Sequence, residues 1–153
     1  MIKTQPTVFG IHSTNVLTEQ GLMDVTLIIG NGIISEIREG EINSDFPIEE
    51  LGDLVVMPGI IDSHVHINEP GRTEWEGFET MTKAAVAGGI TTLVDMPLNS
   101  SPVTVSAEAF KNKLDATNGK LYCNCGFWGG VVPENTDKLE ELIKSGVLGL
   151  KAF

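Results

Sequence analysis

Two histidines and an aspartate occupy alternate positions in a short apolar segment of the sequence. Asp62, His64 and His66 lie within residues 59–67, which are bounded by polar residues and rich in β-branched side chains, a pattern typical of a buried strand. Side chains at alternate positions of a strand project from one face. The Cα atoms of the two histidines would then be about 6–7 Å apart. Both imidazoles can therefore reach one divalent cation at the usual Zn–N distance of about 2.0–2.1 Å.

The phase of these three residues decides between two interpretations. A single histidine on an apolar strand is more often a hydrogen-bonded core residue than a ligand. Two histidines in phase, with a carboxylate in phase as well, favour a metal site formed by His64 and His66. Asp62, one step further back on the same face, would orient an imidazole or close the base of the site.

A third candidate is Lys151, which lies inside the apolar segment 147–153. An unpaired buried ammonium is unfavourable, and burial lowers the pKa of a lysine. The resulting neutral amine can add CO₂ to form a carbamate, an anionic ligand able to bridge two cations. The spacing alone favours a simpler alternative. Either the Lys151 ammonium extends to solvent at the rim of the domain, or the residue lies at a solvated strand end.

The elements that must position these residues alternate between strand and helix. The expected strands are 59–67, 90–96, 121–128 and 147–153, and the expected helices are 75–88, 106–118 and 135–145. Such alternation predicts a parallel sheet with right-handed crossovers. Three βα units and a fourth strand are half of a (β/α)8 TIM-type barrel, in which active sites lie at the carboxyl ends of the strands. His64 and His66 fall at such an end.

The first part of the chain has a different character. Residues 1–57 contain short β-prone segments separated by turn signals, and the Asn31-Gly32 pair is the strongest hairpin signal in the sequence. These features predict the N-terminal part of a small antiparallel β-sandwich module. The predicted fold class is therefore α/β, with this module followed by the first half of the barrel in residues 58–153.

Composition limits the class of partner. The chain has 153 residues and a formal net charge of −11, which argues against nucleic-acid and anionic-membrane partners. Its apolar runs are far shorter than the roughly 20 residues of a membrane span, and the N-terminus lacks the apolar region of a secretory signal.

Cys123 and Cys125 are expected to be reduced, buried thiols. A cytoplasmic location is expected, with mitochondria or peroxisomes as alternatives.

Several loop residues near the expected catalytic face have two interpretations each. Asn99 would either donate to a substrate carbonyl or form a turn. Glu69 and Arg72 would form a loop salt bridge or reach substrate. Asp95 would be either a polar group of the barrel interior or a turn residue before Pro97, and the second is favoured. Trp75 is expected to be a core or helix-packing residue.

The segment from Asp62 to Gly77 reads D-x-H-x-H-x-x-E-P-G-R-x-x-W-E-G. It resembles the cyclic-amidohydrolase branch of the amidohydrolase superfamily, and within that branch it is most similar to the allantoinases. The similarity continues through residues 121–132 to residues 146–153 and includes the N-terminal β segment. It covers nearly all of this chain, but only about the first third of a family member.

This resemblance implies a binuclear zinc site, with two zinc ions per complete subunit. On matching positions, His64 and His66 would hold the first metal, and Lys151, as N6-carboxylysine, would bridge both. The implied reaction is hydrolysis of a cyclic amide in the hydantoin ring of allantoin, giving allantoate in purine catabolism. The implied full-length protein is a homo-oligomer, a tetramer.

Residues beside the histidines favour one subfamily over its relatives. Dihydroorotases carry an arginine two residues after the second histidine to bind a substrate carboxylate. Asn68 occupies that position here, and allantoin has no carboxylate. Hydantoinases and dihydropyrimidinases lack the E-P-G-R stretch. The resemblance also implies that Asn68, Arg72 and Asn99 contact substrate.

The chain departs from the family pattern in its ligand set. The remaining ligands of the family, two histidines and one aspartate, come from later strands, and the only other histidine here is His12 in the β module. The metal site is therefore expected to be incomplete, and the isolated chain inactive and poorly stable. A fragment, a partial gene model or a truncated isoform would explain this. The alternatives are a hydantoinase, dihydropyrimidinase or dihydroorotase, or a non-catalytic scaffold relative.

Overall fold

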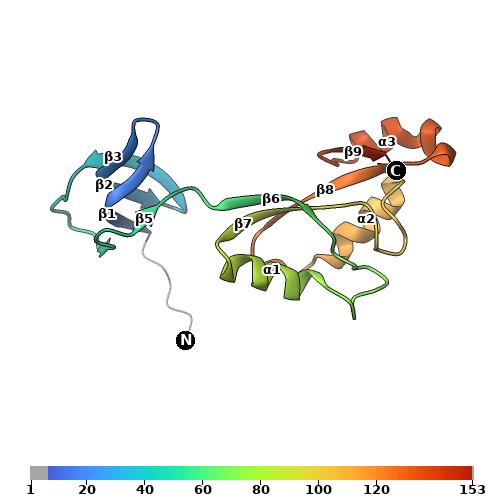
Figure 1. Ribbon diagram of the computed structural model, residues 1–153, viewed down its shortest axis with the longest axis horizontal. Coiled ribbons are helices and arrows are strands. Elements are labelled where there is room, and N and C mark those ends of the chain that lie inside the picture. The colour runs from blue at the N-terminus through green and yellow to red at the C-terminus, as the bar shows by residue number, and fades with distance from the viewer. Residues whose placement is uncertain (1–6, 153) are drawn as a thin grey trace. The chain divides into compact units, whose positions relative to one another are not determined.

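The computed structural model describes residues 7–152 of the chain (Figure 1). The chain divides into two compact units, Met1–Pro58 and Gly59–Phe153, which we call the N-terminal sheet unit and the barrel unit. The boundary predicted from the sequence lies after residue 57, one residue before the observed one.

The N-terminal sheet unit contains one mixed five-stranded sheet. Its strands are β1 (Val8–Thr18), β2 (Gly21–Gly30), β3 (Ile33–Glu39), β4 (Ile48–Glu50) and β5 (Val55–Val56). β1, β2 and β3 are antiparallel neighbours, whereas β4 and β5 both pair with β1 in parallel. The expectation of a purely antiparallel module is therefore wrong, because the long connection after β3 carries the chain back to the start of β1. That this sheet belongs to a β-sandwich stays a prediction.

The hairpin expected at Asn31-Gly32 is confirmed. Both residues have positive φ, 52° and 78°, between the paired strands β2 and β3. This is the backbone that a two-residue turn of type I′ requires, and Asn and Gly adopt it readily. Alternate residues of β2, namely Val25, Leu27 and Ile29, then form the core of the unit with Val16.

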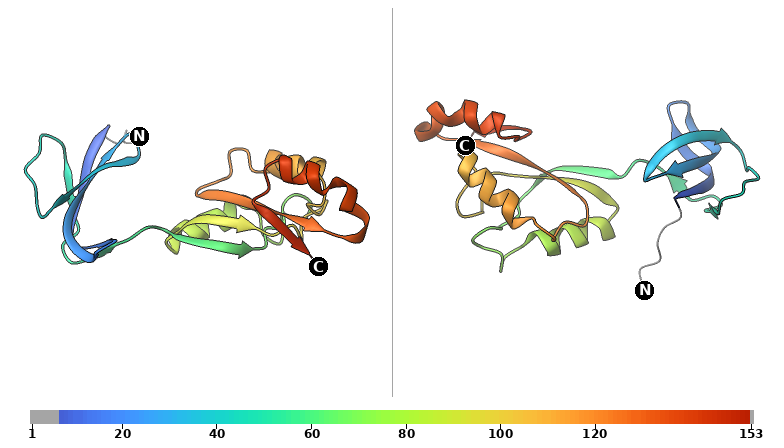
Figure 2. Two further views of the ribbon diagram at one scale, coloured as in Figure 1. Left: turned by 90° about the horizontal axis from the view of Figure 1, so that it is seen from above. Right: turned by 180° about the vertical axis from the view of Figure 1, so that it is seen from behind.

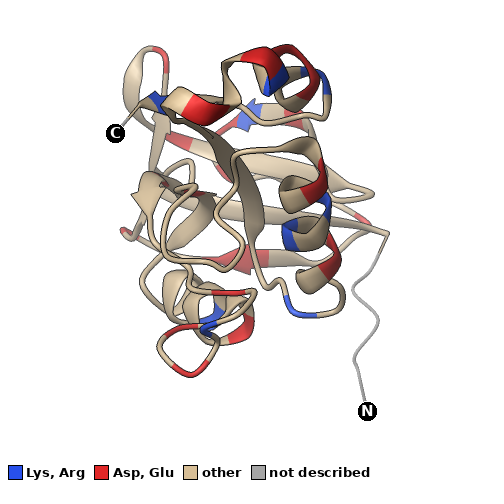
Figure 3. Cartoon of the chain, turned by 90° about the vertical axis from the view of Figure 1, so that its right-hand side faces the viewer, with Lys and Arg blue, Asp and Glu red and all other residues tan. Residues whose placement is uncertain are grey.

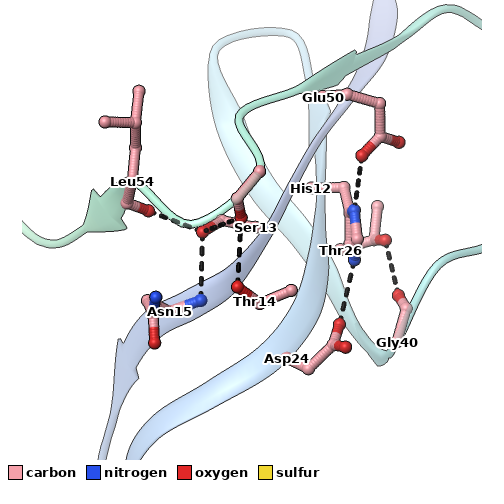
Figure 4. Close-up of polar contacts among 10 residues, drawn as sticks. His12, Ser13, Thr14, Asn15, Asp24, Thr26, Gly40, Glu50 and Leu54 are labelled. Carbon is pink, nitrogen blue, oxygen red and sulfur yellow. Dashed lines mark hydrogen bonds and ion pairs between the residues drawn. The ribbon is translucent and has the colours of Figure 1, made fainter.

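His12 is buried in this unit between two carboxylates. Its Nδ1 lies 2.5 Å from Glu50 Oε2 and its Nε2 lies 2.9 Å from Asp24 Oδ1 (Figure 4). Hydrogen bonds to Asp24 and then to Glu50 raise the pKa of His12 above its ordinary value of 6.5, although burial opposes them. Because Asp24 lies on β2 and Glu50 on β4, the imidazole links both strands to β1.

The barrel unit is a parallel sheet with its strands in sequence order, β6-β7-β8-β9 (Figure 2). The strands are β6 (Ile60–Val65), β7 (Ile90–Asp95), β8 (Asn124–Val131) and β9 (Gly149–Ala152). The helices are α1 (Phe78–Ala87), α2 (Ala107–Ala116) and α3 (Leu139–Lys144), the last preceded by a 3₁₀ helix at Pro133–Lys138. This confirms the expected half of a (β/α)8 barrel.

The three helices pack on the sheet through one apolar cluster. Phe78 of α1, Phe110 of α2 and Leu142 of α3 are all at most 3% exposed and meet Leu93 and Phe127 of the sheet. Phe127 is in edge contact with Phe78 and Phe110, at ring-centroid distances of 6.1 and 5.7 Å. One face of the sheet is therefore covered by helices, and side chains projecting from the other face are left for a site.

The outward faces of the helices carry charged pairs. Each helix has one i,i+4 ion pair, namely Glu79–Lys83, Lys111–Asp115 and Glu140–Lys144. Acidic and basic positions are interspersed along the chain (Figure 3), with 21 Asp and Glu against 10 Lys and Arg. None of the helices within residues 7–152 has the length and apolar character needed to cross a membrane.

Candidate metal centre

The structure brings together the two histidines and the lysine singled out in the sequence. Lys151 Nζ lies 3.3 Å from His64 Nε2, and the rings of His64 and His66 have centroids 5.4 Å apart at an interplanar angle of 48°. His64 is exposed, whereas His66 and Lys151 are half-buried. All three lie at or just beyond the carboxyl ends of their strands, the end at which barrel enzymes build their sites.

Curvature of the sheet makes this contact possible. His64 belongs to β6 and Lys151 to β9, the two edge strands of the four-stranded sheet. Neighbouring strands lie about 4.8 Å apart, so these backbones would be about 14 Å apart in a flat sheet. Side chains stand roughly perpendicular to a sheet, so the two can meet only across a concave face. The barrel curvature therefore forms the site.

A bulge in β6 modifies the expected strand geometry. Asp62 pairs with Leu93 and Val65 with Asp95, so three steps on β6 match two on β7. The Asp62 carboxylate accepts the backbone N–H of His64 at 3.0 Å, in place of a ladder partner. Asp62 thus contacts the backbone of His64, and its expected role of orienting an imidazole or closing the base of the site stays a prediction. Bulges are common beside active sites, where they redirect a side chain.

His66 has the properties of an available ligand. Its Nδ1 is buried without a hydrogen-bond partner among the described residues. Burial lowers the pKa of His66, and electrostatic repulsion, mainly from Lys151, lowers it further. A neutral imidazole is the form that binds a metal, so His66 fits a divalent cation, and the His64 ring lies beside it with a centroid distance of 5.4 Å. Residues 7–152 contain no cluster of three His, Cys, Asp or Glu side chains able to hold one.

The loop that follows the histidines is held by Glu69. This carboxylate is 5% exposed, accepts the N–H of Phe78 at 2.9 Å and pairs with Lys120. The predicted Glu69–Arg72 loop salt bridge is therefore wrong, because Lys120 takes that place. Helix α1 starts at Phe78 rather than near residue 75, since the residues before it form this loop.

The proposed substrate-binding residues lie on two loops that are joined to each other. Asn68 and Arg72 belong to the loop after β6, and Asn99 to the loop after β7. Ser101 donates its backbone N–H to Pro70 O at 2.8 Å, which ties the two loops together. Both loops leave the carboxyl ends of their strands, on the side where His64 and His66 lie.

These three residues differ in their surroundings. Asn68 is buried, and its Oδ1 has no partner among the described residues. Asn99 has φ of 72°, a conformation that asparagine tolerates. The Arg72 guanidinium lies 5.0 Å from the ring centroid of Trp75, a cation–π contact. Trp75 is 65% exposed, so its expected place in the core is wrong.

Two features were missed or misplaced by sequence reasoning. Asp95 is not a turn residue: it is fully buried and ion-paired with Lys113 of α2, with a 2.5 Å contact. Burial raises the pKa of Asp95 to about 6, and the Lys113 ammonium opposes that rise. A signal was present, because Lys113 follows Ala109 and Phe110 at the spacing of a core-facing helix stripe.

The fold agrees with the relatives of the chain. Residues 55–151 match the model of the amidohydrolase family, and the chain belongs to that family. It is 52% identical over 151 residues to a probable allantoinase of Oryza sativa subsp. japonica and 48% identical over 153 residues to an allantoinase of Arabidopsis thaliana. In both comparisons 95% of this chain is covered but only 30% of the relative, so the chain spans about a third of the length of these relatives.

Solved structures show the same architecture. The L-hydantoinase (dihydropyrimidinase) of Arthrobacter aurescens superposes with a TM-score of 0.81 at 24% identity, over 93% of this chain and 32% of that one. At this identity the likeness concerns the fold alone. It supports the assignment of the barrel unit as half of a (β/α)8 barrel.

Proposed function

We propose that the protein containing this chain is an allantoinase, which hydrolyses the cyclic amide of allantoin to allantoate. The observation that carries the proposal is the 3.3 Å approach of Lys151 Nζ to His64 Nε2, beside His66. The similarity to allantoinases over most of this chain supports the choice of substrate.

His64 and His66 would hold one zinc ion, and Lys151 would bridge two after conversion to a carbamate. In that conversion the neutral Nζ attacks CO₂, an N–C bond forms and one proton leaves. An ammonium must first lose a proton to give this neutral amine, so two protons leave in all when a lysine cation becomes the anionic carbamate ligand. When bound, the zinc pair polarises the scissile carbonyl and lowers the pKa of a water molecule.

Substrate recognition would fall to the two joined loops. The Asn68 Oδ1 has no partner among the described residues and can accept an N–H of the hydantoin ring. A neutral amide suits a substrate without a carboxylate. Arg72 and Asn99 would contact the carbonyl and ureido groups from the same side.

The other ligands would come from residues beyond those described. Two zinc ions per complete subunit, a homotetramer and a cytoplasmic, mitochondrial or peroxisomal location belong to this proposal. We expect the 153-residue chain alone to be inactive, because it would supply only part of the ligand set.

The test is a substrate panel with the full-length protein. Turnover of allantoin, hydantoin, dihydrouracil and dihydroorotate is compared, with zinc counted by elemental analysis. The proposal requires allantoin to be the best substrate and His64→Ala to abolish its turnover. Preference for another member of the panel would assign the protein to that branch instead. A protein that binds no zinc and turns over none of them would be a scaffold.

A further inference from the structure

Asp95 and Lys113 form the most deeply buried ion pair among the described residues, with 0% and 1% of their side chains exposed. Lys113 Nζ lies 2.5 Å from Asp95 Oδ2 and donates to Met96 O at 3.2 Å. The other carboxylate oxygen, Oδ1, accepts the backbone N–H of Ile67 at 2.7 Å. The pair thus joins helix α2 to the residue that directly follows His66.

The end of β7 holds the chain on both sides of His66. Met96 donates its N–H to Val65 O at 2.8 Å, and Asp95 accepts the N–H of Ile67. β6 ends at Val65, so the Ile67 N–H lies beyond the strand ladder. A buried N–H must find an acceptor, and the Asp95 carboxylate supplies it. The backbone of His66 is therefore fixed at both neighbours.

Global stability alone does not account for a charged pair at this place. Replacing a buried ion pair by apolar residues of similar volume is often neutral or stabilising, whereas removing one partner is strongly destabilising. What an apolar pair cannot do is accept the Ile67 N–H. A charged acceptor also makes a shorter and stronger hydrogen bond than a neutral one.

We propose that Asp95 and Lys113 are positioning residues, which hold the His66 backbone so that its imidazole is aimed into the metal site. Lys113 orients the Asp95 carboxylate through its contact with Oδ2, and Asp95 Oδ1 in turn holds the Ile67 N–H. The metal part of this inference rests on the proposed function, whereas the backbone part does not.

The test uses the full-length protein with two readouts. Amide hydrogen exchange of the segment around Ile67 reports the backbone, and zinc affinity is measured by competition with a chromophoric chelator. In the double variant Asp95→Leu with Lys113→Met, exchange at Ile67 should accelerate and zinc affinity should fall about 10–100-fold, the usual effect of removing a group that orients a ligand. The double variant Asp95→Asn with Lys113→Met retains an acceptor and should lose much less affinity.

Two further variants keep the test decisive. Lys111→Met removes an exposed charge from the same helix, where Lys111 pairs with Asp115, and should change neither readout. Asp95→Glu keeps the charge but displaces the acceptor, so exchange at Ile67 should accelerate and zinc affinity should fall. This variant supplies the test if the apolar double variant does not fold.

The outcomes distinguish the positioning role of Asp95 and Lys113 from the proposed metal centre. The positioning role would be overturned if a folded variant, either Asp95→Leu/Lys113→Met or Asp95→Glu, kept unchanged amide exchange at Ile67 and unchanged zinc affinity. Absence of zinc from the unmodified protein, with Ile67 still protected through Asp95, would overturn the proposed metal centre and leave the backbone role standing.

Discussion

Lys151 Nζ lies 3.3 Å from His64 Nε2, although 87 positions separate the two residues in sequence. This contact joins the first and last strands of the parallel sheet. It places an amine where a carbamate could share a cation with the imidazoles, and it leads directly to a first prediction.

Replacing Lys151 by alanine in the full-length protein should lower zinc content below two per subunit and reduce allantoin turnover by more than about 100-fold, beyond the effect of losing a residue that only orients a ligand. Lys144→Ala, which removes an exposed ion pair with Glu140, is the matched control. Elemental analysis and allantoate formation measure the two effects. Normal zinc content and turnover in Lys151→Ala would exclude the bridging role.

Metal removal should lower stability. A ligand that binds only the folded state stabilises it by about 2.7 kcal/mol at a hundred times its dissociation constant. Chelation should therefore lower the unfolding temperature of the full-length protein, and added zinc should restore it. A His64→Ala/His66→Ala variant should respond to neither treatment. Equal unfolding temperatures of the zinc-loaded and chelated proteins would contradict this prediction.

Glu69 should contribute to stability through the loop that it holds. Glu69→Ala removes the acceptor of the Phe78 N–H and the partner of Lys120. A buried donor left without a partner costs about 1–3 kcal/mol, and we expect a loss of that size in urea unfolding. Glu79→Ala breaks only the exposed pair with Lys83 and should change stability by less than about 1 kcal/mol. Equal losses in both variants would argue against the buried role.

His12 should make the stability of the N-terminal sheet unit depend on pH. Its pKa in the folded state is raised above 6.5 by hydrogen bonds to Asp24 and Glu50. Its stabilising contribution is therefore fully present below pH 6.5 and is lost as the pH rises through the folded-state pKa. Thermal unfolding across this range, compared with His12→Gln, measures it. The difference between the two proteins should shrink as the pH rises, and a constant difference would contradict the assignment.

Local signals predicted many of the elements. The Asn31-Gly32 hairpin is as expected, because turn preferences depend on a few neighbouring residues. Errors arose where a distant partner decided the outcome. Glu69 pairs with Lys120 across 51 positions, and no local pattern selects Lys120 over Arg72.

By itself the sequence determined the alternation of strands and helices, the metal-type spacing of His64 and His66 and the family. The alternation and the spacing follow from periodicity and side-chain chemistry, which are local properties, and the family follows from the resemblance of the segment from Asp62 to Gly77. Only the tertiary structure decided that Lys151 contacts His64 and that Asp95 contacts Lys113 of α2 and the N–H of Ile67. Those contacts depend on the curvature of the sheet and the packing of α2 against it, because a side chain finds a distant partner only after the backbone has brought both to one place.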